Sequence, residues 1–336
     1  MKKIFSLILS LILSCLFVIN CFAFSINSDS YSFSELDNRV SSLTNLIDKD
    51  TRISNRAPLY DSNEKIIAWC YTLSPKGYVI INSENYIIEY SLYNNLNFGL
   101  NEKIYYTGPL QYFKKDGNSY TNLKSLKKVE KKYFNDLSAR FDKKKEQIKS
   151  TEQSISRNNI TPNSLVTTNI PGTLRTYSYN PNGICGSTAA AILLMYYRDY
   201  IDSFVVPSWH ATQDGKSLIQ LLEPNIDGAT PGSVTTDVVS GLNWYFRWRG
   251  ISNSYNARST VSTSFNAYRQ RIDAKRPAIV GIHDHPTYSA HWTVGHGYRI
   301  EQHGSTYYYA MVNDGWGSNN IEISMRYVDD IVYLNK

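Results

Sequence analysis

Cysteine is scarce in this chain of 336 residues, which contains only four. Cys15 and Cys21 lie in an apolar N-terminal stretch that we expect to be removed, so Cys70 and Cys185 remain. Exported proteins that depend on cysteine for stability are usually rich in disulfides. The scarcity therefore excludes a disulfide framework. A single Cys70–Cys185 bond fits the count, and so does a free thiol kept for catalysis.

The N-terminus has the pattern of a secretory signal peptide. Two lysines precede an apolar run from Ile4 to Ile19, and small residues at Cys21 and Ala23 suit cleavage after Ala23. We expect residues 1–23 to be removed, which places the protein outside the cell or at the cell envelope, with no stable membrane insertion. The length of the run also allows an uncleaved anchor, and "ILSC" around Cys15 weakly resembles a lipoprotein signal.

Motifs for nucleic-acid and metal binding are lacking. The formal charge is +6, and residues 114–149 contain 12 Lys and Arg against five Asp and Glu. Basic surfaces attract nucleic acids and anionic membranes, but no helix-turn-helix or zinc finger accompanies this one. We interpret it as a solvated helix face and expect no nucleic-acid partner. His283 and His285 lack a cysteine or carboxylate cluster to complete a ligand set, so we expect neither metal nor cofactor.

The first half predicts a small α+β domain over residues 24–155. Apolar spacing indicates a helix over residues 33–48, and three β-rich runs separated by turn sequences between residues 65 and 93 indicate a meander. An apolar stripe from Leu123 to Phe141 predicts a helix that ends near Ser150. The polar stretch that follows lacks periodicity and predicts a linker and domain boundary at about residues 150–165.

The second half, residues 165–336, predicts helices first and adjacent strands afterwards. This order indicates an α+β fold in which the chemistry lies where the first helix meets the sheet. The predicted helices begin at Cys185 and cover residues 234–246 and 265–272, and the predicted strands cover residues 278–282, 292–300, 307–312 and 321–327.

Cys185 stands at the start of the apolar helix "CGSTAAAILLMYY" rather than within it. Backbone N–H groups without partners and the positive end of the helix dipole favour a thiolate at such a position. We therefore expect the pKa of Cys185 to lie below the usual value of about 8.5. The other interpretation is a buried structural cysteine at a helix start.

Two further stretches complete a candidate constellation. A nucleophilic thiolate needs a proton acceptor that later protonates the leaving group, and His291 in "SAHWTVGHGY" suits this role. A third polar group usually orients such a histidine. Asn313 and Asp314 in "VNDGWG" are both candidates, but neighbours on a strand face opposite ways. We favour Asn313, with Asp314 as the alternative.

Together these motifs resemble papain-like cysteine peptidases, above all the secreted streptopain type and the C39-like domains related to bacteriocin-processing enzymes. The resemblance rests on Cys-Gly-Ser at a helix start, His-x-x-Val-x-x-Gly-Tyr from His291, and Asn followed by Trp-Gly. It covers residues 165–336 and implies Cys185 as nucleophile, His291 as general base and acid, and Trp316 as a shield for the pair. It also implies a papain-like fold, with the cysteine in the helical part and the histidine and Asn/Asp on an antiparallel sheet.

A weaker resemblance covers residues 71–95, which are similar to the propeptide of streptopain relatives. It implies that the first half is a pro-domain that inhibits the enzyme until it is cut away. The chain departs from the papain pattern at Tyr179, where the family has an oxyanion glutamine six residues before the cysteine. Asn180, Asn182 and the N–H of Cys185 are the remaining candidate oxyanion donors.

The sequence therefore predicts a secreted cysteine endopeptidase made as a proenzyme. Its partners would be a peptide or protein substrate and its own propeptide, and we expect a monomer. Two alternatives remain open. One is a Cys-dependent acyl or amide transferase with the same triad, and the other is a secreted binding module that has kept the fold and lost activity.

Overall fold

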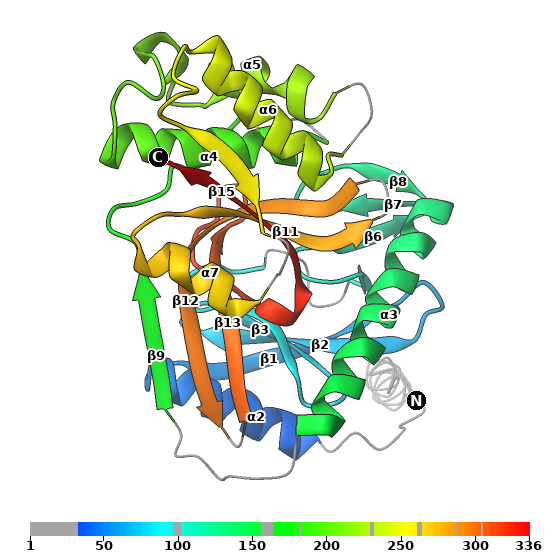
Figure 1. Cartoon of the computed structure of the whole chain (residues 1–336). Helices are drawn as coiled ribbons and strands as arrows, with labels where there is room; N and C mark the ends of the chain where they lie inside the picture. Colours follow the sequence, from blue (N-terminus) through cyan, green and yellow to red (C-terminus); the bar gives the residue numbers. More distant parts are fainter. Residues whose placement is uncertain are drawn as a thin grey trace, which may run out of the picture. The chain divides into compact units, whose positions relative to one another are not determined.

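A single mixed sheet runs through the computed structural model of the chain, and helices cover parts of it (Figure 1). The structure describes residues 33–96, 102–155, 164–179, 181, 183–228, 232–260, 264–285, 288–303 and 305–336. Within these residues the sheet has fifteen strands, and residues 35–336 form one compact unit. The predicted signal peptide lies outside the described residues. None of the described helices combines the length and the apolar character needed to cross a bilayer.

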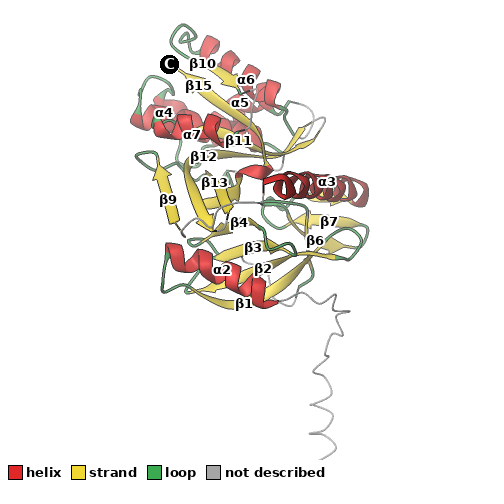
Figure 2. Cartoon of the chain, turned by 60° about the horizontal axis from the view of Figure 1, so that its bottom comes forward, coloured by secondary structure: helices red, strands yellow, loops and turns green. Residues whose placement is uncertain are grey.

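The first half begins with a helix and an antiparallel meander, as predicted. Helix α2 (Phe33–Ile47) buries side chains at helical spacing, and Figure 2 shows it lying along strands β1 to β3. Strands β2 (Ile66–Ser74), β3 (Tyr78–Asn82) and β4 (Ile87–Ser91) coincide with the three β-rich runs. Every residue of β3 and β4 is buried, so the centre of the sheet is covered on both faces. Strand β1 (Arg52–Tyr60), which pairs with β2, was not predicted.

The helix predicted from Leu123 onward is wrong in its first part. Strand β8 (Lys128–Glu130) precedes helix α3 (Lys131–Ile155), which extends beyond the predicted end near Ser150. Pairing with the preceding strand places Val129 opposite Tyr120, in a small core that also contains Phe134. This long-range burial outweighs the helical spacing. Three other strands build this part of the sheet, namely β5 (Ile104–Tyr106), β6 (Tyr112–Asp116) and β7 (Ser119–Asn122).

The second half confirms the α+β class, and most of its strands follow its helices as predicted. Its helices are α4 (Cys185–Tyr200), α5 (Lys216–Ile226), α6 (Thr235–Trp248) and α7 (Phe265–Asp273). Its strands are β9 (Ser164–Asn169), β10 (Asn256–Ser259), β11 (Ala278–His285), β12 (Tyr288–His303), β13 (Ser305–Asn313), β14 (Ile321–Ser324) and β15 (Val328–Asn335). Strand β9 precedes the first helix and β10 lies between two helices, and neither of these strands, nor α5 and β15, was predicted. A 3-10 turn over Met325–Tyr327 replaces the end of the predicted strand 321–327. Helix α4 packs against α5, β11 and β12.

Strands β4 and β14 join the two halves of the chain into one sheet. Their antiparallel register places Tyr90 opposite Glu322 and Glu89 opposite Ile323. One buried charged pair also links the two halves, and a second lies beside the junction within the second half. Buried Arg39 on α2 donates two hydrogen bonds to Glu301 on β12, one of them 2.9 Å long, and buried Arg299 donates to Glu322 at 2.8 Å. The first half is thereby held through main-chain and charged contacts on the same sheet that carries His291.

We predict that Arg39→Ala lowers the free energy of unfolding by about 3–5 kcal/mol, because it leaves the buried carboxylate of Glu301 without its cation. The matched control is Arg56→Ala, which breaks an exposed pair with Asp37 and should cost about 0–1 kcal/mol. Chemical denaturation of the intact chain measures both. Equal, small losses would contradict a structural role for the buried pair.

Candidate functional site

Helix α4 holds Cys185 at its first position, where the helix meets the sheet. The side chains from Gly186 to Tyr197 are buried, which locks the helix in place, while Cys185 itself is half-buried. The main-chain N–H groups of Trp292 and Gly186 are near enough to the sulfur to lower the pKa of the thiol. Trp292 follows His291 on β12, so the tertiary structure brings the candidate nucleophile beside the strand residue that follows the candidate base.

The thiol of Cys185 is not acidic in this structure. Burial and the nearby Asp227 carboxylate raise its pKa to about 12. The expectation of a lowered pKa is therefore wrong for this form of the chain. The main reason is burial of the sulfur. A second reason lies at the helix start, where the N–H of Ser187 donates to Asp227 at 2.8 Å. A carboxylate thus occupies the position at the helix N-terminus that would favour a thiolate.

His291 is buried on β12, where it pairs with Ile282 of β11. Its Nε2 lies 2.7 Å from the main-chain oxygen of Asp314. A carbonyl oxygen can only accept, so Nε2 carries the proton and Nδ1 keeps the lone pair needed of a base. Trp316 stacks on the imidazole, with ring centroids 3.7 Å apart and planes 15° apart. Burial lowers the pKa of His291 to about 4, so the ring is neutral near pH 7.

The two candidate orienting residues have different surroundings. The Asn313 amide donates to the main-chain oxygen of Arg175 at 3.1 Å and to Asn319 Oδ1 at 2.7 Å, and its oxygen accepts from Gly315 N–H. These contacts hold the turn after β13. Asp314 lies beside His291 and accepts from the N–H groups of Trp316 and Ser318. In this structure His291 is held by the main-chain oxygen of Asp314, so the choice of the third triad residue stays a prediction.

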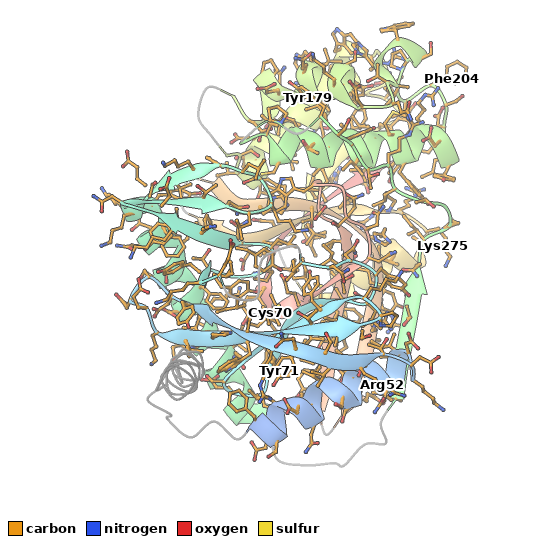
Figure 3. All side chains as sticks on the ribbon, turned by 180° about the vertical axis from the view of Figure 1, so that it is seen from behind. Arg52, Cys70, Tyr71, Tyr179, Phe204 and Lys275 are labelled. Atoms are coloured by element: carbon orange, nitrogen blue, oxygen red, sulfur yellow. The ribbon has the colours of Figure 1, made fainter. Side chains whose placement is uncertain are left out.

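The remaining predicted residues divide into described and undescribed ones. Asn180 and Asn182, the candidate oxyanion donors, lie outside the described residues, as do the side chains of His283 and His285. Tyr179 lies beside the helical part of the chain (Figure 3). The Lys216 ammonium group lies over its ring. Buried His296 lies on the same strand as His291.

Cys70 and Cys185 do not form the disulfide that the cysteine count allowed. Both are free thiols. Cys70 lies on strand β2, where its neighbours across the sheet are Ala57 and Ile80, and it is part of the apolar core (Figure 3). Burial raises the pKa of its thiol well above the usual range. We assign Cys70 a packing role, because an inert, buried thiol is the usual state of a core cysteine.

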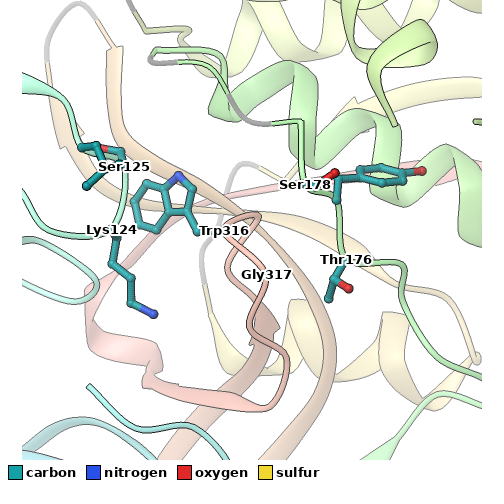
Figure 4. A pocket seen from close by; sticks show the side chains of 8 residues that line it. Lys124, Ser125, Thr176, Ser178, Trp316 and Gly317 are labelled. Atoms are coloured by element: carbon teal, nitrogen blue, oxygen red, sulfur yellow. The ribbon is translucent and has the colours of Figure 1, made fainter. Parts of the chain in front are cut away.

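A groove of about 470 Å³ opens beside Trp316 (Figure 4). Lys124, Ser125 and Leu126, from the loop between β7 and β8, form one wall, and residues 176–178 form the other. Lys124 Nζ lies 3.4 Å from the buried carboxylate of Asp314. The positive charge of Lys127, in the same loop, acts on Cys185. The first half of the chain thus contributes a wall of the candidate site.

Sequence reasoning missed two residues that contact the site most closely. Asp227 follows helix α5 in an unremarkable turn, and Lys124 lies in a stretch assigned to a helix. Neither carries a local pattern that indicates its role. Both approach the site through long-range packing, so only a prediction of contacts between distant segments would have found them.

A family model described as the Peptidase_C39 like family matches residues 167–334, half of the 336-residue chain. The chain belongs to the Peptidase_C39 like family. The matched segment begins within β9, ends within β15, and contains Cys185, His291, Asn313 and Asp314. No curated protein matches the chain. Membership agrees with the resemblance that the sequence motifs indicated.

We predict that Cys185 in the intact, folded chain is alkylated by iodoacetamide on the order of 10²–10³ times more slowly at pH 8 than a free thiol, because only the thiolate reacts. The rate should rise with pH toward about pH 12, as the thiol ionises. Peptide mapping by mass spectrometry separates Cys185 from Cys70, and the urea-unfolded chain is the control. A rate plateau below pH 9 would contradict the protonated state.

Proposed function

We propose that this chain is a cysteine peptidase with Cys185 as nucleophile and His291 as general base and acid. The observation that supports this most directly is the hydrogen bond from His291 Nε2 to Asp314 O, because it leaves the Nδ1 lone pair free. The next residue on the same strand, Trp292, acts on the Cys185 thiol through its main-chain N–H. The family model supports a peptidase in general terms. The papain-like fold and export from the cell belong to the same proposal.

In the proposed reaction His291 Nδ1 accepts the thiol proton as the Cys185 sulfur attacks a peptide carbonyl carbon. The tetrahedral intermediate collapses to a thioester, and His291 gives its proton to the leaving amine. Water then attacks the thioester while His291 accepts one of its protons, and the acid product leaves as the thiol re-forms. The stacked Trp316 keeps water from one face of the imidazole, and main-chain N–H groups near the sulfur offer stabilisation to the oxyanion.

We further propose that residues 24–155 are a pro-region that keeps the site inactive. Three features support this. The loop between β7 and β8 forms one wall of the groove beside Trp316, Lys124 is paired with Asp314, and burial holds Cys185 as a thiol and His291 as a neutral imidazole. Removal of that loop would admit water to the pair, which favours charged forms of both groups. Cleavage between α3 and β9 would release the mature domain as a monomer.

The first test compares the wild type with Cys185→Ala during expression. We expect the wild-type 38.4-kDa chain to be processed and the Cys185→Ala chain to persist, because the cleavage needs the nucleophile. Gel analysis and N-terminal sequencing measure this.

A peptide epoxide provides a second measurement. The processed wild type should be labelled by it, whereas folded His291→Ala should not. If both chains are processed alike and neither is labelled, the binding module is favoured over the peptidase. Transfer of the acyl group to an added amine would favour the transferase.

The second test addresses the pro-region. We predict that Lys124→Ala raises the rate of epoxide labelling of the unprocessed chain about fivefold, because loss of the pair with Asp314 loosens the loop by about 1 kcal/mol. The matched control is Lys128→Ala, in which the exposed pair with Asp116 is lost from the neighbouring strand. An equal effect of the two variants, or no effect of Lys124→Ala, would contradict inhibition by this loop.

A further inference from the structure

The start of helix α4 is built around a buried carboxylate from another part of the fold. Asp227 is the residue that ends α5, and 4% of its surface is exposed. The N–H of Ser187 donates to its Oδ2 at 2.8 Å, and the Ser187 hydroxyl donates to the same oxygen. The hydroxyl of Ser233 donates to Oδ1 at 2.9 Å. Three hydrogen-bond donors therefore contact the Asp227 carboxylate. Two of them belong to Ser187, which lies two residues after the candidate nucleophile Cys185.

This number of donors stabilises the ionised form of Asp227. A carboxylate that accepts several hydrogen bonds at a helix N-terminus is favoured by both the bonds and the helix dipole. Burial acts in the opposite direction and raises the pKa of Asp227 from its ordinary value, while the bonds from Ser187 and Ser233 lower it. Both serine hydroxyls are oriented as donors to the carboxylate, so a charged acceptor suits the site better than a protonated acid.

Close packing leaves no room for a side chain between the carboxylate and the nucleophile. A Cβ added to Gly186, the residue after Cys185, would lie 2.9 Å from Asp227 Oδ1 and 2.2 Å from Ser233 Oγ. The glycine in the Cys-Gly-Ser motif is therefore required by the approach of Asp227 and Ser233. The Cys-Gly-Ser motif and the Asp227 carboxylate therefore pack together as one structural unit.

The same unit contacts the strand that carries His291. The main-chain oxygen of Ser233 accepts from the indole Nε1 of Trp292 at 3.0 Å, and Ser233 itself donates to Asp227. Hydrogen bonds thus connect Ser187 on α4, Asp227 after α5, Ser233 before α6 and Trp292 on β12. Cys185 and His291 each adjoin a member of this chain of contacts, so their separation depends on it.

We propose that Asp227 is a positioning residue that anchors the first turn of α4 and places beside Cys185 a negative charge that opposes ionisation of its thiol. The catalytic part of this role rests on the proposed peptidase function, whereas the effect on the thiol does not. The other charged or titratable groups near the sulfur are Lys127, whose charge favours the thiolate, and His291, which is neutral. Asp227 is the nearby group that disfavours the thiolate.

Holding the Cys185 sulfur in the thiol form would protect an exported enzyme from oxidants. A thiol reacts much more slowly with oxidants than a thiolate does. A carboxylate that opposes ionisation of the sulfur would protect the nucleophile from oxidants in the intact chain, before the proposed removal of the pro-region. The anchor and the charge are then two effects of the same side chain.

The test is the pH dependence of Cys185 alkylation by iodoacetamide in the intact chain, measured by peptide mapping. Asp227→Asn keeps the shape of the side chain and one acceptor oxygen but removes the charge. We expect it to shift the rate–pH profile to lower pH. The alkylation rate at pH 8 should rise about tenfold, which corresponds to a fall of about one unit in the thiol pKa. Asp227→Glu keeps the charge but lengthens the side chain in a closely packed site, so it reports loosening of the helix start and should accelerate alkylation less than Asp227→Asn. The same order is expected for the reaction with hydrogen peroxide.

Asp202→Asn is the matched control, because Asp202 also accepts from a hydroxyl and a main-chain N–H but is absent from the groups that act on Cys185. It should leave the profile unchanged.

Equal acceleration by Asp227→Asn and Asp227→Glu would overturn the proposal, since loosening of the helix start alone would then explain it. An unchanged rate in Asp227→Asn would overturn it too. If Asp227→Asn does not fold, Asp227→Ser is a smaller neutral replacement for the same assay. Because alkylation needs no peptide cleavage, a chain without peptidase activity still tests the inference.

Discussion

The pairing of β4 with β14 is the constraint on which the rest of the structure depends. It joins strands from the two halves of the chain in one sheet, and the surrounding carboxylates are buried with their partners. Burial raises the pKa of Glu89 to about 8 and that of Glu322 to about 7. Breaking the junction would expose the main-chain groups of β4 and β14 and would separate Arg39 from Glu301, the buried pair that links the two halves. The loop with Lys124 therefore stays beside the candidate site as long as the sheet is intact.

At the site itself, two negatively charged groups compete for one helix N-terminus. In the simplest picture the sulfur of Cys185 benefits from the free N–H groups of α4. In this chain Asp227 accepts the hydrogen bond from the Ser187 N–H, and the N–H groups of Gly186 and Trp292 lower the pKa of the Cys185 thiol only in part. Burial then raises the pKa of the thiol and lowers that of His291. The Cys185 thiol and the His291 imidazole are therefore both neutral in the intact chain, rather than a thiolate–imidazolium pair.

Much of the fold followed from local patterns. Period-2 and period-3.6 spacing identified α2, β2, β3, α4 and the strands β11 to β13, because each of these elements buries one continuous apolar stripe or is buried on both faces. The spacing misled at Leu123 to Val129, where an antiparallel partner at Tyr120 outweighed a helical stripe. It missed β1, which contains Arg52, Arg56 and Pro58, and a strand of such composition is formed by its neighbours rather than by its own propensity.

The sequence by itself determined the α+β class, the family resemblance and the candidates Cys185 and His291, because a nucleophile at a helix start and a histidine on a strand are read from residue order alone. Only the tertiary structure decided which groups surround them. Asp227, Lys124 and the main-chain oxygen of Asp314 approach from other segments, and their hydrogen bonds, charge and exclusion of water set the protonation states. A pKa depends on every group within a few ångströms, and such neighbours are assembled by folding rather than by sequence order.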